Sequence, residues 1–244
     1  MTVVVAFLSR KGGVGKSTMA RALCAVAARK GLKTKLADLD PAQRTASRWQ
    51  RLRDRNLVLP SISVAAFDNA DSAVATSSDA DLLIIDGPGQ NLELTAEIAS
   101  VAHTVVQPCG ACFDDLQPAM ELFYNLANAG VPKARLQIAL SRLSEPGEET
   151  AARAYVDVAG FSVLPGAIMD HARYREAHNR GLAFIEIPGE DLTASAGHLL
   201  GALLTRVLDK HRLLQAAATA TRENTPVLKY PAPFAPPPPQ PAYC

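Results

Sequence analysis

Short apolar runs alternate with helix-forming segments along most of the chain. Val3 to Leu8 is rich in β-branched residues and predicts a buried parallel strand. The alanine- and leucine-rich residues from 17 to 30 predict a helix that ends at Gly31. Further strands are predicted over 32–40, 81–89, 103–108 and 134–143, and a further helix over 116–129. The alternation implies right-handed βαβ crossovers, because parallel neighbours need a long connection between them.

The predicted fold is α/β, a doubly wound and mostly parallel sheet with helices on both faces. A chain of 244 residues, 48% of them hydrophobic, is long enough to bury one sizeable core. Leucines and a valine recur at helical spacing over 193–215, which predicts a C-terminal amphipathic helix packed on the sheet. We therefore expect a single globular domain over residues 1–218.

Proline dominates the end of the chain. The segment "TPVLKYPAPFAPPPPQPAYC" has no apolar periodicity, and such a composition favours extended polyproline II conformations. We expect residues 219–244 to form a disordered, proline-rich tail. Two roles fit it, a solvated tail or a docking peptide for a partner.

Charge is balanced over the whole chain but uneven along it. The formal net charge is +1 and the isoelectric point is near 7.7, so affinity for nucleic acid has to come from local basic patches. One such patch is predicted on a helix, where four arginines spaced four, three and four residues apart form a stripe: Arg44, Arg48, Arg51 and Arg55. The stripe is either a solvated face or a contact for DNA or an acidic partner.

Membrane and disulfide signals are absent from the sequence pattern. No run of 18 apolar residues occurs, and the short apolar start leads straight into a glycine-rich loop, so we expect a cytoplasmic protein without stable membrane insertion. The four cysteines are expected to be reduced thiols: Cys24, Cys109, Cys112 and Cys244. The C-x-x-C pair at 109–112 lacks the further ligands that a zinc site needs.

Candidate chemistry concentrates in the stretch "SRKGGVGKST", residues 9–18, which follows the first predicted strand. Three glycines let successive backbone N–H groups face a phosphate, and the next helix adds its positive end: Gly12, Gly13 and Gly15. Lys16 is placed to reach the β- and γ-phosphates, and the Ser17 hydroxyl to bind Mg²⁺. Arg10 stands where the usual phosphate-loop pattern has glycine, and a second lysine, Lys11, follows it.

Three motifs together resemble the ParA/MinD family of deviant Walker A ATPases. "KGGVGKST" resembles the family's phosphate loop, in which the first lysine is the distinguishing residue. "DLDPAQRTASRW", residues 38–49, is similar to its second motif, and "LLIIDGPG" stands in the place of its Walker B strand. The likeness covers residues 1–210, in the order and spacing of small ParF-like partition ATPases. The resemblance implies a P-loop NTPase fold.

The resemblance also implies roles for individual residues. Lys16 would hold the phosphates of its own subunit, while Lys11 would reach across a dimer interface to those of the other. Asp40 would orient the attacking water, and Asp38, Asp86 and Ser17 would support Mg²⁺. The implied nucleotide contacts are Gly12, Gly13, Val14, Gly15, Lys16, Ser17, Thr18 and, at the base, Arg142. The implied cofactors are ATP, ADP and Mg²⁺, although strand-end aspartates can instead cap the next helix.

As a function, the resemblance implies an ATPase that is weak alone and stimulated by a partner. With ATP it would close into a sandwich homodimer, bind DNA without sequence preference and associate with the nucleoid. Its output would be partition or positioning of a plasmid, a chromosome locus or another cargo, through a ParB-like or other adaptor. Basic residues lie in regions where the family's dimer gathers positive charge: Arg173, Arg175, Arg180, Arg206, Lys210 and Arg212.

Two alternative functions stay open on the sequence. Two copies of Cys109 and Cys112 could meet across a dimer axis and hold an iron-sulfur cluster, as in an iron-sulfur or redox carrier. The other alternative is a MinD-like regulator recruited to membranes. Against it, the chain ends in proline-rich sequence and not in a short basic amphipathic helix.

Overall fold

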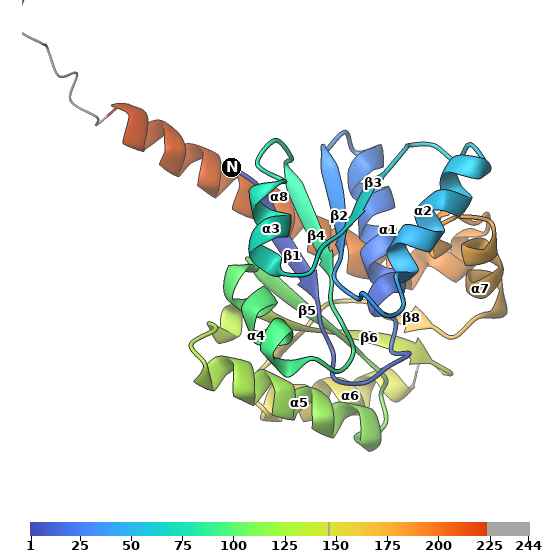
Figure 1. Cartoon of the computed structure of the whole chain (residues 1–244). Coiled ribbons are helices and arrows are strands. Elements are labelled where there is room, and N and C mark those ends of the chain that lie inside the picture. The colour runs from blue at the N-terminus through green and yellow to red at the C-terminus, as the bar shows by residue number, and fades with distance from the viewer. Residues whose placement is uncertain (146, 224–244) are drawn as a thin grey trace, which may run out of the picture.

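The computed structural model describes residues 1–145 and 147–223, which form one α/β unit around a parallel sheet (Figure 1). In this part of the chain the sheet has eight strands, in the order β3-β2-β4-β1-β5-β6-β7, with β8 paired to β6. Every strand pair is parallel. The strands are β1 Val3–Phe7, β2 Thr34–Asp38, β3 Ser63–Ala66, β4 Leu82–Asp86, β5 Thr104–Cys109, β6 Leu136–Leu143, β7 Ser162–Val163 and β8 Ile168–Met169.

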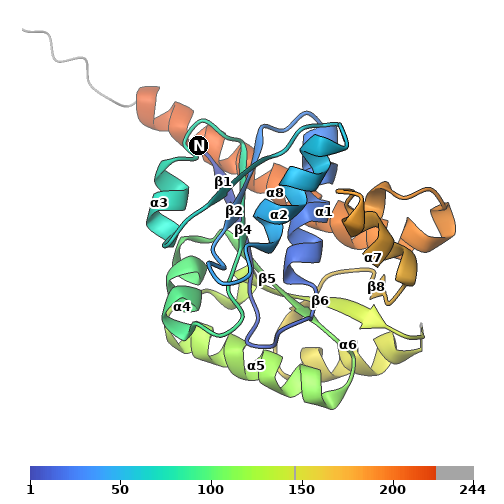
Figure 2. The same cartoon turned by 45° about the vertical axis from the view of Figure 1, so that its right-hand side comes forward.

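Helices cover both faces of the sheet (Figures 1 and 2). Side chains of α3, α4, α5 and α6 fill the core on one face, and those of α1, α2, α7 and α8 fill the core on the other. The helices are α1 Lys16–Arg29, α2 Thr45–Arg55, α3 Ala70–Ala75, α4 Leu92–Val101, α5 Phe113–Asn128, α6 Glu148–Val158, α7 Ala172–Asn179 and α8 Glu190–Glu223, with 3₁₀ turns η1 Lys133–Arg135 and η2 Phe184–Glu186. The predicted doubly wound α/β class is confirmed.

The central strand β1 shows why one short apolar run serves two cores. Val4 and Ala6 face the core under α4 and α5, while Val3, Val5 and Phe7 face the core under α1 and α8. Successive strand residues point to opposite faces, so a strand covered on both sides must be apolar throughout. All five residues are buried, as the continuous apolar pattern predicts.

The topology brings the predicted motifs to one edge of the sheet. β1 lies between β4 and β5, and β2 lies on the other side of β4. Asp86 at the end of β4 is in register with Phe7 of β1 and with Asp38 of β2. Loops that follow the carboxyl ends of parallel strands meet at one edge, which is where open α/β sheets bind ligands.

The C-terminal helix α8 is longer than the predicted 193–215. It begins at Glu190 and ends at Glu223, because the alanine-rich residues after Gln215 are strong helix formers without an interrupting proline. Its inner residues Leu199, Leu200 and Leu203 are buried against the sheet, and its far end projects away from the body (Figure 1). The predicted boundary at 218 falls within this helix, and residues 224–244 lie outside the described chain. Among the described helices, none has both the length and the apolarity to cross a membrane.

Removal of everything after Gln215 is expected to change the melting temperature by less than about 2 °C. The next residues, Ala216 and Ala217, are exposed on the projecting end of α8. Differential scanning calorimetry of the truncated and full-length chains measures the shift. A loss of more than about 5 °C would show that the end of the chain packs on the domain.

Candidate functional site

The phosphate loop connects β1 to α1 and is shaped by glycines with positive φ. Gly13 has φ of 73° and Gly15 has φ of 103°, in the left-handed region where other residues are strained. Gly15 occupies the N-cap position, and α1 begins at the next residue, Lys16. The loop therefore presents the unpaired N–H groups of a helix start, together with its positive end, to an anion.

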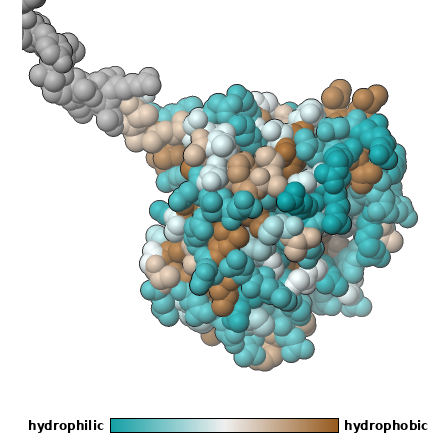
Figure 3. All heavy atoms as spheres, in the orientation of Figure 1, coloured by the Kyte–Doolittle hydropathy of each residue, from teal (hydrophilic) through white to brown (hydrophobic). Residues whose placement is uncertain are grey.

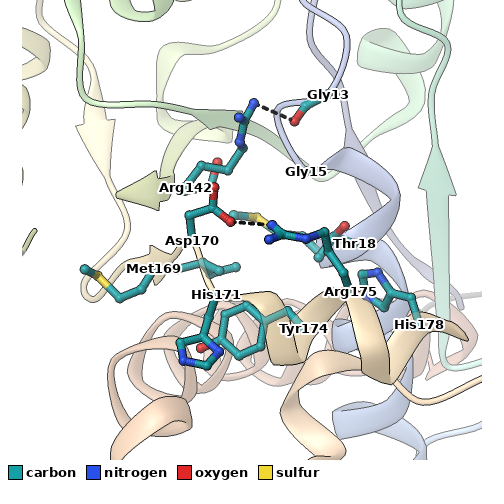
Figure 4. Close-up of a pocket in the computed structure, with 13 residues that line it drawn as sticks. Gly13, Gly15, Thr18, Arg142, Met169, Asp170, His171, Tyr174, Arg175 and His178 are labelled. Carbon is teal, nitrogen blue, oxygen red and sulfur yellow. Dashed lines mark hydrogen bonds and ion pairs between the residues drawn. The ribbon is translucent and has the colours of Figure 1, made fainter. Parts of the chain in front are cut away.

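The end of β6 holds this loop from one side. The Ser141 hydroxyl donates to the Val14 carbonyl oxygen at 2.7 Å, and Arg142 Nη1 donates to the Gly13 carbonyl oxygen at 3.1 Å. Arg142 itself has φ of 58°, a conformation that turns its side chain back over the loop (Figure 4). The predicted base contact is thus also a clamp on the loop.

The two lysines of the loop lie in different environments. Lys16 is buried, with Nζ 3.4 Å from the Lys11 carbonyl oxygen, and burial lowers its pKa against the opposing charges of Asp86 and Asp40. The Lys11 side chain is 49% exposed and makes an ion pair with Asp115 at the start of α5, which raises the Lys11 pKa. Lys16 is therefore placed inside the site, and Lys11 on its open face.

The aspartate pair after β2 organises its own loop. Asp38 is buried; one carboxylate oxygen accepts from the Asp40 N–H at 3.2 Å, and the other accepts from the Ser47 N–H and hydroxyl, each at 3.0 Å. Asp40 in turn accepts from the N–H groups of Ala42 and Gln43 at 3.2 and 3.0 Å. The bonds of Asp38 cap the first turn of α2, whereas those of Asp40 close the turn that precedes the helix. The capping role considered above therefore holds for Asp38.

Asp86 is the buried carboxylate that best fits a cation. Both of its oxygens are buried without a hydrogen-bond partner among the described residues. Burial raises the Asp86 pKa to about 7, Asp38 adds to the effect, and the nearby Ser17, Arg21 and Lys16 oppose it. No described group of three or more histidine, cysteine or acidic residues forms a ready-made metal cage. Mg²⁺ needs none, since it is held by one or two protein oxygens, water and phosphate.

Asp86→Asn is expected to remove a pH dependence of stability. The folded chain binds the Asp86 proton more tightly than the unfolded chain, so stability of the nucleotide-free protein falls as pH rises from 3.8 to about 7. At about pH 8 the variant should be more stable than wild type by at least about 1 kcal/mol, and near pH 4 the two should match. Urea denaturation at both pH values measures this.

The control for that experiment is Asp79→Asn. Asp79 pairs with Lys33 and Lys35 at the surface, and these lysines hold its pKa well below the ordinary value. The stability that ionised Asp79 contributes is present above its ordinary pKa and is lost as pH falls. The variant should therefore be no more stable than wild type at pH 8. An equal gain from both substitutions would contradict burial of Asp86 as the cause.

Arg21 is a buried charge at the site that the sequence pattern does not single out. It lies on α1, donates from Nη2 to the Thr45 carbonyl oxygen at 2.8 Å, and stands 5.7 Å from the centre of the Trp49 ring. Its charge acts favourably on Asp86 and Asp38. It joins α1 to the first turn of α2 behind the carboxylates, an arrangement visible only once the helices are packed.

A cavity of about 370 Å³ opens beside the phosphate loop (Figure 4). Its walls come from the loop, from β6 and from the segment around α7, which is far away in the sequence. The lining residues are Gly13, Gly15, Thr18, Met19, Ser141, Arg142, Ile168, Met169, Asp170, His171, Tyr174, Arg175 and His178. A partly apolar cavity at the end of a phosphate cradle is suited to the base and sugar of a nucleotide.

Two histidines in this cavity had no assigned role in the sequence. His171 caps α7, with its Nδ1 accepting from the Arg173 N–H at 3.2 Å. Burial, with Arg21 nearby, lowers the His178 pKa to about 4, so this imidazole is neutral at physiological pH. Asp170 accepts from Arg175 at 2.9 Å across the cavity wall (Figure 4). The sequence carried no signal for these contacts, because they depend on how α7 packs.

The two thiols of the C-x-x-C pair lie in different environments. Cys109 is buried at the end of β5, and burial raises its pKa to about 12, whereas Cys112 is exposed before α5. Cys24, Cys109 and Cys112 are free thiols in the described part of the chain, and Cys244 lies outside it. A protonated thiol inside the core is a poor cluster ligand.

Comparison with known proteins identifies the family. Residues 5–234 match the model of the CobQ/CobB/MinD/ParA nucleotide binding domain. The chain belongs to this family. None of the curated proteins matches the sequence.

Solved structures of the family share the fold at low sequence identity. The ATP complex of the D38A variant of Cyanothece McdA superimposes with a TM-score of 0.63 at 17% identity, over 83% of this chain and 96% of that one. MinD from Pyrococcus horikoshii, complexed with Mg-ADP, gives 0.66 at 16%, over 82% and 95%. A ParA family ATPase from Chlorobium tepidum gives 0.61 at 14%, over 83% and 99%. The predicted ParA/MinD relationship is confirmed.

Proposed function

We propose that the protein is a ParA-like ATPase that binds MgATP and closes into an ATP-dependent sandwich homodimer. The observation that carries this proposal is the separation of the two loop lysines. Lys16 is buried within the site, whereas Lys11 stands half-exposed on the open face and pairs with Asp115. A charge on that face contributes little to phosphate binding in its own subunit. It is well placed to contact phosphates presented by a second copy.

The remaining roles are those that the resemblance implies, and the geometry of the site supports them. The loop from Gly12 to Thr18 would hold the phosphates, and the cavity beside Arg142 would hold the base. Asp86 and Ser17 would bind Mg²⁺, which would neutralise charge on the phosphates. Asp38 would fix the loop that carries Asp40, and Asp40 would orient the attacking water. Known structures with ATP and with Mg-ADP support the choice of cofactors.

The ATP-bound dimer would bind DNA without sequence preference and thereby position a plasmid, a chromosome locus or another cargo. A near-neutral chain reaches a useful charge density only when two basic surfaces are joined. The predicted arginine stripe supports this in part: Arg48, Arg51 and Arg55 are exposed on α2, while Arg44 is exposed at its N-cap with φ of 46° and not on the helix. A ParB-like or other adaptor would stimulate hydrolysis and so release the complex from the nucleoid.

DNA binding is expected only in the presence of ATP and is expected to depend steeply on salt. If the dimer neutralises roughly six phosphates, affinity should fall about a thousandfold between about 50 and 200 mM salt. Fluorescence anisotropy with a labelled duplex of arbitrary sequence, in ATP and in ADP, measures both effects. Equal affinity with ADP, or indifference to salt, would contradict the proposed mechanism.

The two alternative functions gain different support from the structure. The buried Cys109 thiol argues against an iron-sulfur or redox carrier, and an absorbance spectrum after anaerobic purification should show no cluster band. A MinD-like regulator shares the fold, and its recruitment by the end of the chain concerns residues outside the described range. A MinD-like regulator would use the same ATPase mechanism as the DNA-binding protein proposed above.

A further inference from the structure

The loop between α2 and β3 carries two leucines that face solvent. Leu57 is 85% exposed and Leu59 is 77% exposed, and neither belongs to the two hydrophobic cores. In the space-filling view, hydrophobic surface stands at the corner of the molecule where α2 ends (Figure 3). The loop projects from the surface at this corner (Figure 3).

Leu57 also holds a backbone conformation that favours glycine. Its φ is 53°. The Leu57 N–H donates to the Asp54 carbonyl oxygen at 3.1 Å, and the Val58 N–H donates to the Arg53 carbonyl oxygen at 3.0 Å. This pair of bonds is the helix ending in which glycine is the usual residue at the position of Leu57. The leucine is strained there and regains nothing by burial. Local strain kept at an exposed position points to a role outside folding.

The exposure of the two leucines is fixed by the buried side of the loop. Arg53 is fully buried, and its Nε and Nη2 donate to the Pro60 carbonyl oxygen at 3.1 and 3.0 Å. Its guanidinium is itself held by Glu186 at 2.7 and 3.0 Å. On the other side, Asn56 Nδ2 donates to the Arg180 carbonyl oxygen at 2.9 Å. The loop cannot fold back onto the domain without breaking these bonds.

Arginines surround the loop. Arg51 and Arg55 are exposed on the last turns of α2, and Arg180 is exposed beside Asn56. Within the described chain, none of these three guanidinium groups makes an ion pair, and Asp54 is the acidic residue among them. The corner therefore combines fixed apolar side chains with unpaired positive charge.

We propose that this corner, defined as Leu57 and Leu59 with Arg51, Arg55 and Arg180, is a peripheral contact for an anionic lipid surface. Leucines on a projecting loop can enter the boundary between headgroups and acyl chains, while arginines bind the lipid phosphates. DNA offers the same phosphates but no apolar phase for the leucines. The contact is separate from the nucleotide site and goes beyond the proposed function, and it shares Arg51 and Arg55 with the arginine stripe proposed to contact DNA.

The test is co-sedimentation of the full-length protein with vesicles of phosphatidylcholine, with and without about 30% phosphatidylglycerol. Wild type should bind the anionic vesicles and not the neutral ones. Leu57→Asn keeps nearly the same side-chain size and favours positive φ, so it should lower vesicle binding about tenfold while raising the melting temperature by about 2 to 4 °C. Arg55→Gln should also weaken vesicle binding, and the loss should be larger for vesicles that contain more phosphatidylglycerol.

The matched control is Val158→Thr, at a residue on α6 that is 90% exposed and lies away from this corner. This substitution should leave vesicle binding unchanged. That result would show that loss of an exposed apolar side chain elsewhere does not reduce vesicle binding. Failure of wild type to bind anionic vesicles would overturn the proposal and direct attention to a protein partner. Unchanged binding by Leu57→Asn would also overturn it, because the corner would then act as a simple polyanion contact.

Discussion

Lys16→Ala is expected to lower the affinity for ADP by at least about a hundredfold. Lys16 is the buried cation of the phosphate loop, and its Nζ lies under the loop beside the Lys11 carbonyl oxygen. Loss of a charge that contacts phosphate directly removes most of the attraction for the nucleotide. Titration with a fluorescent ADP analogue measures the change.

Lys11→Ala is the matched control, because it removes the same charge from the same loop. Lys11 lies on the open face with half its side chain exposed, so the variant should bind ADP within a few-fold of wild type. If the two variants lost equal affinity, the assignment of Lys16 to its own subunit's phosphates would be wrong.

Arg53→Ala is expected to lower the free energy of unfolding by about 3 to 5 kcal/mol. The Arg53 and Glu186 side chains are fully buried and joined by two hydrogen bonds of 2.7 and 3.0 Å. The same guanidinium stands 5.2 Å from the centre of the Trp49 ring and ties α2 to the segment after α7. Removing it leaves the Glu186 carboxylate in the core with one partner fewer. Urea denaturation measures the difference.

Arg29→Ala tests whether charge pairing with Glu186 is sufficient to explain that loss. Arg29 also contacts Glu186, at 3.0 Å, but its side chain is 48% exposed. A solvated arginine contributes less than about 1 kcal/mol. Replacing both buried partners, as in Arg53→Met with Glu186→Leu, should recover much of the stability lost by Arg53→Ala. Equal losses from Arg53→Ala and Arg29→Ala would contradict the role assigned to burial.

Much of the fold was predictable from local sequence. The apolar run at Val3 is uniformly hydrophobic because β1 is covered on both faces, and Gly31 ends a helix that the alanine pattern had already defined. Short and exposed elements were not predicted: β3 over 63–66 is mostly exposed, and β7 and β8 have two residues each. Such segments carry no periodicity, since tertiary contacts alone decide their conformation.

The candidate site was predictable in part for the same reason. Glycines and charged residues at fixed spacing reveal the phosphate loop, because its chemistry is local in sequence. Asp115, Arg21 and His178 reach the site from α5, α1 and α7 through packing, so nothing near them in the sequence predicts their position. The double role of Asp38, which caps the start of α2 within the proposed metal site, also required the hydrogen bonds to be seen.

The central claim is that Lys11 acts across a dimer interface, and light scattering of Lys11→Ala in ATP tests it most directly. Wild type should double in mass with ATP and stay monomeric with ADP. The variant should stay monomeric in both nucleotides while retaining its affinity for ADP, because only the charge that faces the second subunit is missing. A Lys11→Ala protein that doubles in mass with ATP as wild type does would contradict the sandwich mechanism.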